Sequence, residues 1–206
     1  MTAVADVAAK ATLLIAVAFM FAFPDLSQFE NKSLTLRAVF YPLLALAPYA
    51  ANRLRGANGR FPVVLDLCLS FAMAFDIVSN DLHWYGRWTH WDDFVHFVNS
   101  VPLMVLIIAP LLALERRGTI RLGFWGAAVF ALMIYTSAHA VWEMYEFSMD
   151  RFTGTELQPG GMEEATRNNV AGLVGSFAAV ALLWWWQRLR ALDEMVVEPL
   201  DSYLRS

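Results

Sequence analysis

The sequence is poor in the features that mark disulfide-rich or nucleic-acid-binding proteins. Its one cysteine, Cys68, excludes an intrachain disulfide and a thiolate metal site. Charged residues make up only 17% of the chain, and no basic patch indicates a nucleic-acid partner. Gly/Ser-rich linkers and internal repeats are also absent, so the pattern indicates one domain without a separate soluble module.

Apolar residues dominate the chain instead. They make up 58% of it, and the mean hydropathy is +0.46, which is too apolar for an ordinary soluble domain. We therefore expect an all-α polytopic membrane protein with a single integral membrane domain over residues 1–206. About six transmembrane helices are predicted, at approximately 6–23, 35–51, 61–80, 93–114, 122–147 and 168–186, and 187–206 is predicted to be a cytoplasmic tail.

The basic residues are distributed unevenly between the two sides of this predicted bundle. Ten of the 15 lie near the amino terminus, in alternate loops or after the last span: Lys10, Arg53, Arg55, Arg60, Arg116, Arg117, Arg121, Arg188, Arg190 and Arg205. Basic residues are concentrated on the cytoplasmic side of membrane proteins. Both termini are therefore predicted to be cytoplasmic, and the remaining loops to face outward.

A polar stripe interrupts the predicted helix 122–147 and continues beyond its end. His139, Glu143, Glu146 and Asp150 follow one another in steps of four, three and four residues, which keeps them on one face of a helix. A carboxylate at the bilayer centre costs roughly 2.5–3.5 kcal/mol on insertion scales. Such residues normally face a partner helix, a water-filled cavity or a metal ion.

Other predicted helices carry polar residues at the same, outer end. Helix 61–80 supplies Asp76 and Asn80, and the last helix begins near Glu163, Glu164, Asn168 and Asn169. At the start of helix 93–114, the residues Asp92, His96 and Asn99 share a face at spacings of four and three, with Asp93 beside them. Stripes on several helices predict a shared pocket that opens outward.

Simpler interpretations apply to several of these residues. Carboxylates at a helix start can cap free N–H groups, which would account for Asp92, Asp93, Glu163 or Glu164. Gly172 and Gly175 can serve close helix packing alone. A buried His–Glu or His–Asp pair can also do no more than hold helices together.

His96, His139 and Glu143 lie inside the apolar runs and suit a ligand set, with Asp93 as a further candidate. Imidazole and carboxylate together bind Zn, Mn or non-haem Fe, and spacings of three and four let two ligands of one helix reach one divalent ion. No HExxH motif is present. Candidate catalytic groups are Glu143, Glu146 and Asp92, with a supporting polar cluster of Asp76, Asn80, Asn99, Glu164 and Asn168.

Two segments carry a resemblance to a known family. Trp91 to Asn99 (WDDFVHFVN) and Trp142 to Glu146 (WEMYE), followed by a helix with Gly172 and Gly175, resemble the bacterial YjdF-type integral membrane proteins, which lack an assigned biochemical function. The chain is also distantly similar to VanZ-like proteins. The resemblance covers about residues 76–186.

The resemblance implies the family's characteristic polar positions at Asp93, His96, Glu143 and Glu146, and a location in the bacterial cytoplasmic (inner) membrane. The family usually has acidic residues four apart near the start of the last helix, where this chain has Glu164 and Asn168. Asn168 removes one charge, although an amide can still coordinate a hard cation or hydrogen-bond.

Three functions remain open at this point. The first is a metal-dependent or acid–base enzyme that acts on a lipid-linked or amphiphilic substrate at the outer leaflet. The second is a proton- or ion-coupled transporter, against which the apolar inner halves of helices 93–114 and 122–147 count. The third is a structural membrane subunit whose polar cluster only locks helix packing. The expected partners are the lipid bilayer and that substrate, and the sequence does not identify protein partners.

Overall fold

The computed structural model describes residues 2–30, 32, 34–55 and 61–205, and every regular element in these residues is a helix. The all-α prediction is therefore confirmed. The long helices are α1 (Thr2–Ala22), α2 (Leu34–Arg55), α3 (Val63–Asp81), α5 (Trp91–Arg116), α6 (Gly123–Thr153) and α7 (Gly161–Arg188). The short ones are η1 (Ser27–Phe29), α4 (Trp84–Arg87), η2 (Asp193–Val197) and α8 (Glu198–Arg205). Arg60, one of the basic residues used for orientation, lies outside the described residues.

Among the described helices, five are long and apolar enough to cross a membrane, namely α1, α3, α5, α6 and α7. The other predicted span, 35–51, forms α2. The last two spans are longer than predicted, because α6 continues to Thr153 and α7 begins at Gly161. Gly154 ends α6 in the left-handed conformation (φ 71°) that favours glycine. The hydropathy pattern placed the end of α6 too early and the start of α7 too late, because both segments are polar.

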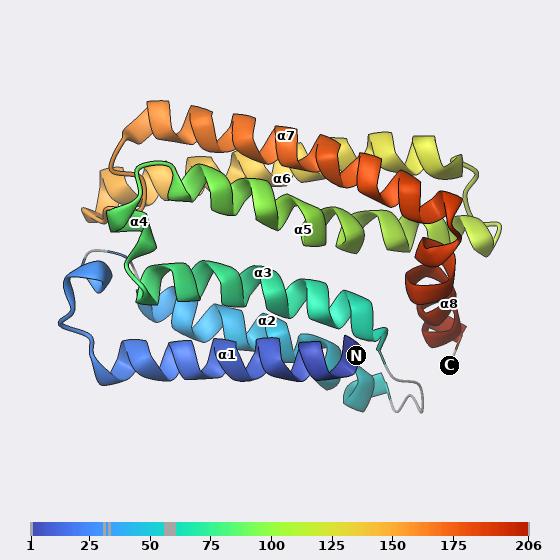
Figure 1. Cartoon of the computed structure of the whole chain (residues 1–206), viewed down its shortest axis with the longest axis horizontal. Coiled ribbons are helices and arrows are strands. Elements are labelled where there is room, and N and C mark those ends of the chain that lie inside the picture. Colours follow the sequence, from blue (N-terminus) through green and yellow to red (C-terminus); the bar gives the residue numbers. More distant parts are fainter. Residues whose placement is uncertain (1, 31, 33, 56–60, 206) are drawn as a thin grey trace.

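The long helices form two groups that lie side by side (Figure 1). One apolar core lies within α1, α2 and α3, and a second lies mainly within α5, α6, α7 and α8, with Leu65 of α3 contributing to it. α3 packs against α5 and joins the groups. Both chain termini lie at one end of the bundle, and α4 lies at the opposite end. We call these the terminal end and the α4 end.

Two glycines allow α7 to approach its neighbours closely. A Cβ atom at Gly175 would meet the backbone carbonyl of Phe97 and, at 2.7 Å, the Ser100 hydroxyl of α5. A Cβ at Gly172 would lie 2.6 Å from the His139 ring of α6. Small residues at such crossings are typical of membrane helix interfaces. α7 therefore fixes the spacing of the helices that carry the polar stripes.

The segment after α7 folds back onto the bundle at the terminal end. Leu192, Val196 and Val197 are fully buried beside α5. Arg117 lies 3.2 Å from Asp201, in an ion pair between α5 and α8. Within the predicted tail 187–206, the described residues after α7 form a packed helical cap, and the location of the tail in the cytoplasm remains a prediction.

Candidate functional site

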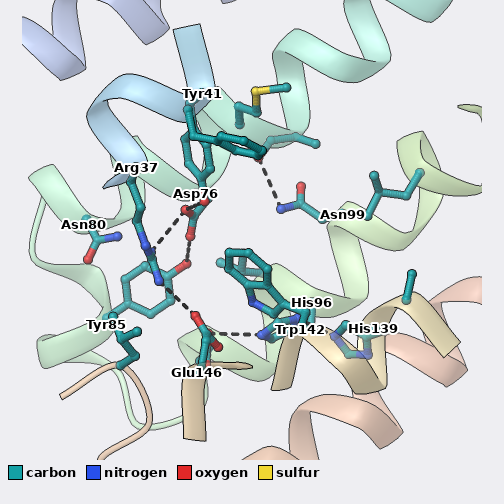
Figure 2. A pocket seen from close by; sticks show the side chains of 18 of the residues that line it. Arg37, Tyr41, Asp76, Asn80, Tyr85, His96, Asn99, His139, Trp142 and Glu146 are labelled. Carbon is teal, nitrogen blue, oxygen red and sulfur yellow. Dashed lines mark hydrogen bonds and ion pairs between the residues drawn. The ribbon is translucent and has the colours of Figure 1, made fainter. Parts of the chain in front are cut away.

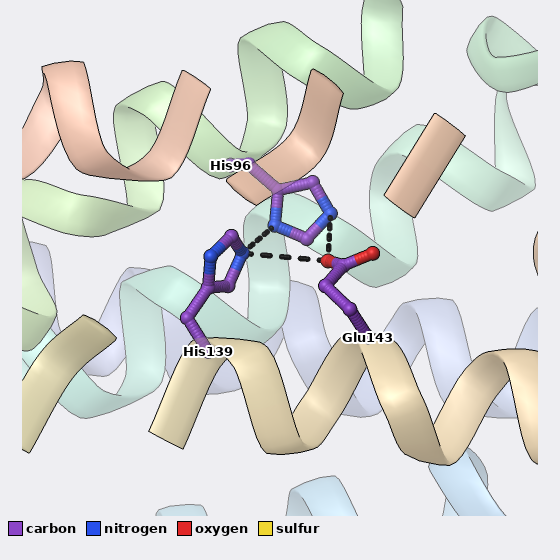
Figure 3. A group of neighbouring side chains, drawn as sticks. All are labelled: His96, His139 and Glu143. Carbon is purple, nitrogen blue, oxygen red and sulfur yellow. Dashed lines mark hydrogen bonds and ion pairs between the residues drawn. The ribbon is translucent and has the colours of Figure 1, made fainter. Parts of the chain in front are cut away.

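The buried end of the polar stripe on α6 meets α5 in a group of three side chains (Figure 3). Glu143 Oε1 lies 3.4 Å from His96 Nε2 and also 3.4 Å from His139 Nε2. The two imidazoles are 2.7 Å apart between His139 Nε2 and His96 Nδ1. One ligand atom from each residue lies within 4.8 Å of the other two, so the three could hold a metal ion.

The Glu143 carboxylate is held from one side only. It is 2% exposed, and its Oε2 atom accepts hydrogen bonds from the amides of Gln158 and, at 3.4 Å, Asn168. Its Oε1 atom, which faces the two histidines, accepts no hydrogen bond from the described residues. Its contacts on that side are the two ion-pair distances of 3.4 Å to the histidines, so this oxygen can still accept a bond from a ligand.

Asp92 extends the group towards the start of α5. Its Oδ1 atom lies 3.5 Å from His96 Nε2, and its Oδ2 atom accepts a 2.7 Å hydrogen bond from Asn168. Asn168 thereby connects Asp92 of α5 with Glu143 of α6. Because Asn168 is an amide donor, it places no third negative charge between these two carboxylates.

Asp93 does not join this group, although it was a predicted metal ligand. Its carboxylate contacts His90 Nδ1 at 3.0 Å and Arg167 Nε at 3.6 Å. Successive residues of a helix point about 100° apart, so Asp92 and Asp93 cannot both face His96. The spacing of four residues places Asp92 there.

A second polar network lies beside the first and joins α2, α3, α4 and α6 (Figure 2). Arg37 contacts Asp76 at 3.3 Å and Glu146 at 3.0 Å. Asp76 also accepts hydrogen bonds from the phenols of Tyr41 at 2.6 Å and Tyr85 at 2.5 Å. Burial, followed by the negative charge of Asp76, holds the pKa of Tyr85 well above its usual value, so this phenol remains a donor.

The two networks border one cavity of about 410 Å³ between the helix groups. Near the α4 end its lining is polar, with Lys32, Arg37, Asp76, Asn80, Asp92, His96, Asn99, Glu146 and Glu164. Towards the terminal end its lining is apolar, with Leu44, Leu69, Met73, Leu103 and Ile107. The predicted shared pocket therefore exists, and it continues into an apolar arm that sequence reasoning did not predict. In the polar part of the cavity, the pKa of Lys32 is lowered by burial of its side chain and then by the positive charge of Arg37.

Packing holds the His139 ring in place. Tyr135 stacks on it, with ring centroids 5.5 Å apart and planes 17° from parallel. The Tyr135 hydroxyl forms a 2.8 Å hydrogen bond with Ser100, which donates to the Gly172 carbonyl at 2.9 Å. α5, α6 and α7 thus meet behind this histidine and restrict its movement.

Most of the predicted supporting residues border the site. Asn80 is buried and lines the cavity, and Asn99 lines it while donating to the Ala72 carbonyl at 3.3 Å. Glu164 lines the cavity as well, but its Oε2 atom accepts a 2.6 Å bond from the Gly160 N–H, as expected of a helix-start cap. Asp150 also binds backbone N–H groups, those of Leu157 and Gln158.

Sequence reasoning missed Gln158, Arg37, Tyr41 and Tyr85. Gln158 lies in the loop between α6 and α7, where helical periodicity gives no signal. Arg37 was not among the predicted site residues. Its position within a predicted span did carry a signal, since a buried arginine in a membrane helix requires an acidic partner.

Comparison with known proteins identifies the family. A family described as predicted membrane protein (DUF2238) matches residues 9–189. YjdF-type proteins are members of this family, so that resemblance is confirmed, while the VanZ likeness remains a prediction. No curated protein and no solved structure matches the chain. The protein belongs to the DUF2238 family of predicted membrane proteins.

Proposed function

We propose that this membrane protein is an enzyme that performs hydrolysis or group transfer on an amphiphilic substrate. In this proposal, His96, His139 and Glu143 hold a divalent metal ion, and nearby carboxylates move protons. The substrate occupies the cavity, with its reacting group at the polar end. The observation that carries the proposal is the geometry around Glu143 Oε1.

That geometry suits a tetrahedral metal site. Zinc binds histidine nitrogens and carboxylate oxygens at about 2.0–2.2 Å, so neighbouring ligand atoms in a tetrahedron lie about 3.4 Å apart. Both His–Glu distances are 3.4 Å. Glu143 Oε1 is also buried without a hydrogen bond from the described residues, as a ligand oxygen awaiting a cation would be. On binding, the ion would replace the hydrogen bond between the two imidazoles.

The donor set restricts the metal. Two imidazoles and one carboxylate are typical of Zn, Mn and non-haem Fe sites, and sites of this composition commonly leave a position for water or substrate. A bound metal would lower the pKa of water and polarise a carbonyl or phosphoryl oxygen. The amides of Gln158 and Asn168 orient Glu143 from behind, as outer hydrogen bonds do in metal sites.

Proton transfer falls to the carboxylates that border the cavity. Asp92 is the better candidate for a general base, because its Oδ1 atom points to His96 and its other oxygen is held by Asn168. Glu146 is engaged by Arg37 at 3.0 Å. We therefore assign Glu146 to holding α2 against α6, and Asp92 to chemistry.

We further propose that α2 is a sixth span and that the α4 end faces outward. Both termini lie at one end in Figure 1, as an even number of spans requires. Arg116, Arg117, Arg188 and Arg190 lie near that end, which the positive-inside rule assigns to the cytoplasm. The site then lies in the outer half of the bacterial cytoplasmic membrane.

The alternative functions fit fewer observations. A transporter requires a polar route to both sides, but apolar side chains fill the terminal half of the bundle. A purely structural role suits Arg37, Asp76 and Glu146, whose charges pair with one another. A structural role for Glu143 would leave its Oε1 atom with ion-pair contacts of 3.4 Å to His96 and His139 but without a hydrogen bond from the described residues.

Metal content tests the proposal. We would purify the protein in mild detergent without chelators and measure bound metals by inductively coupled plasma mass spectrometry. The His96→Ala/Glu143→Ala variant should lose a stoichiometric metal that wild type retains. The matched control is His90→Ala/Asp93→Ala, which removes a histidine and an acid outside the cavity and should keep the metal.

The proposal fails if wild type holds no stoichiometric metal after purification and after reconstitution with Zn, Mn and Fe. Equal metal loss in the control variant would also contradict it, because the metal would then be bound elsewhere. Both variants are compared only after they elute as folded species in size-exclusion chromatography.

A further inference from the structure

The cavity has a polarity gradient that runs along the helices. His96 and Ile107 both line it from α5, and they are eleven residues apart, which is about 16 Å along a helix axis. The α2 lining changes in the same direction, from Arg37 to Leu44. One end of this space can solvate a polar head, and the other can hold only hydrocarbon without leaving polar groups unpaired.

The cavity also opens sideways between α2 and α6. The Arg37–Glu146 ion pair joins these two helices at the polar end, but they do not pack closely along their described lengths, whereas α3 and α5 close the opposite side. Phe40 of α2 and Trp142 of α6 line the cavity and are nevertheless 52% and 37% exposed, and Ala138 of α6 is exposed as well. An opening on the side of a membrane helix bundle faces the acyl chains of the bilayer.

The charges at the polar end favour a cation. Carboxylates outnumber the cationic side chains of the lining by four to two, and Arg37 is already paired with two of those carboxylates. Lys32 donates to the Glu156 carbonyl. If a divalent ion binds beside Glu143, five carboxylates still face four positive charges. An anionic head group would therefore add repulsion, whereas an ammonium group would reduce it.

We propose that the cavity takes a single-chain amphiphile with an amine head group, which enters from the bilayer between α2 and α6. Its hydrocarbon chain lies in the apolar arm beside Leu69, Leu103 and Ile107, and its amine lies among Asp92, Glu146 and Glu164. This inference rests on the proposed function for its chemistry, because it names the substrate class of the same site. Binding itself requires no metal.

Photo-crosslinking tests the inference in lipid nanodiscs that contain the full chain. Two probes carry the same dodecyl chain with a diazirine near its end, one as an amine and one as a carboxylic acid. The amine should label residues 103–107 and be displaced by unlabelled dodecylamine. The acid should label these residues no more than a sample kept in the dark.

A variant of the opening provides the second arm. Ala138→Trp places a large ring at an exposed position of the opening and should reduce amine labelling of residues 103–107 to the dark background. The matched control, Ala178→Trp, adds the same ring at an exposed position of α7 that does not line the cavity. The amine probe should label residues 103–107 of this variant as strongly as those of wild type.

Several results would overturn the inference. Equal labelling by the acid contradicts the amine head group, and unchanged labelling in Ala138→Trp contradicts lateral entry. A protein that holds stoichiometric metal but is not labelled in the arm refutes the inference and leaves the proposed enzyme. Specific amine labelling in a protein that binds no metal refutes the metal enzyme and leaves the inference.

Discussion

Replacing Gly172 by alanine should weaken metal binding without unfolding the protein. A Cβ atom there would lie 2.6 Å from His139 Cε1, 2.8 Å from His139 Nδ1 and 2.8 Å from the Tyr135 hydroxyl. Carbon atoms in comfortable contact are about 3.5–4.0 Å apart, so the imidazole must move by about 1 Å. The backbone of α7 can remain in place, because these three atoms belong to side chains.

A movement of this size is large for a metal ligand. Ligand distances in metal sites are held within about 0.2 Å of their usual values, so a 1 Å shift of His139 removes much of its bonding. Disturbing the groups that orient a ligand typically costs 10–100-fold in affinity, and we expect a loss of about that size. Alanine is the better helix former by about 0.5–1 kcal/mol, which offsets part of the steric cost in stability.

The assay is a metal titration against a chromophoric chelator, paired with a thermal unfolding curve of the metal-free protein. Gly175→Ala is the contrasting variant, because its Cβ would meet the Phe97 carbonyl oxygen and lie 2.9 Å from Phe97 Cα, and a backbone cannot step aside. It should lower the unfolding temperature markedly. If Gly172→Ala bound metal as tightly as wild type does, the packing of Gly172 against His139 would not position this ligand.

Three further predictions follow from the two networks. Arg37→Gln leaves the buried carboxylates of Asp76 and Glu146 without their cation and should cost about 3–5 kcal/mol of stability in thermal or denaturant unfolding. Adding Glu146→Gln should recover part of this loss. Wild-type stability in Arg37→Gln would contradict the pairing. Gln158→Leu removes a hydrogen-bond donor to Glu143 and should weaken metal binding by about 10–100-fold in the same titration. Unchanged metal affinity in this variant would contradict the orienting role of Gln158. Metal at a hundred times its dissociation constant should stabilise wild type by about 2.7 kcal/mol and leave the His96→Ala/Glu143→Ala variant unaffected.

Helical periodicity was sufficient to predict much of the site. The steps of four and three along α5 placed Asp92 and His96 on one face, and the same steps along α6 aligned His139, Glu143 and Glu146. Because hydrophobic helices must turn such stripes towards one another, their convergence could be predicted without a structure. The family resemblance pointed to Asp93, whose role in metal binding stays a prediction, whereas the spacing of four residues pointed to Asp92.

The remaining features depend on contacts that no periodic pattern encodes. Gln158 reaches Glu143 only because Asp150 binds the backbone N–H groups of Leu157 and Gln158, which sets the path of the loop. The pairing of Arg37 with Glu146 depends on how α2 lies against α6. The apolar arm results from the incomplete packing of these two helices. A leucine has the same hydropathy whether it faces a cavity or lipid, so the sequence could not predict the arm.

The apolar packing of the terminal half of the bundle favours the proposed enzyme, which works at one side of the membrane, over a transporter that moves a substrate between the two sides. Alternating access would require a route from the apolar arm past Leu65 and Ile108, which are buried in the core that α3 shares with α5. To open this route, α3 would have to separate from α5 at the terminal end, where η2 packs against both helices. The proposed enzyme needs no such rearrangement, because its amphiphilic substrate would enter and leave the cavity on one side.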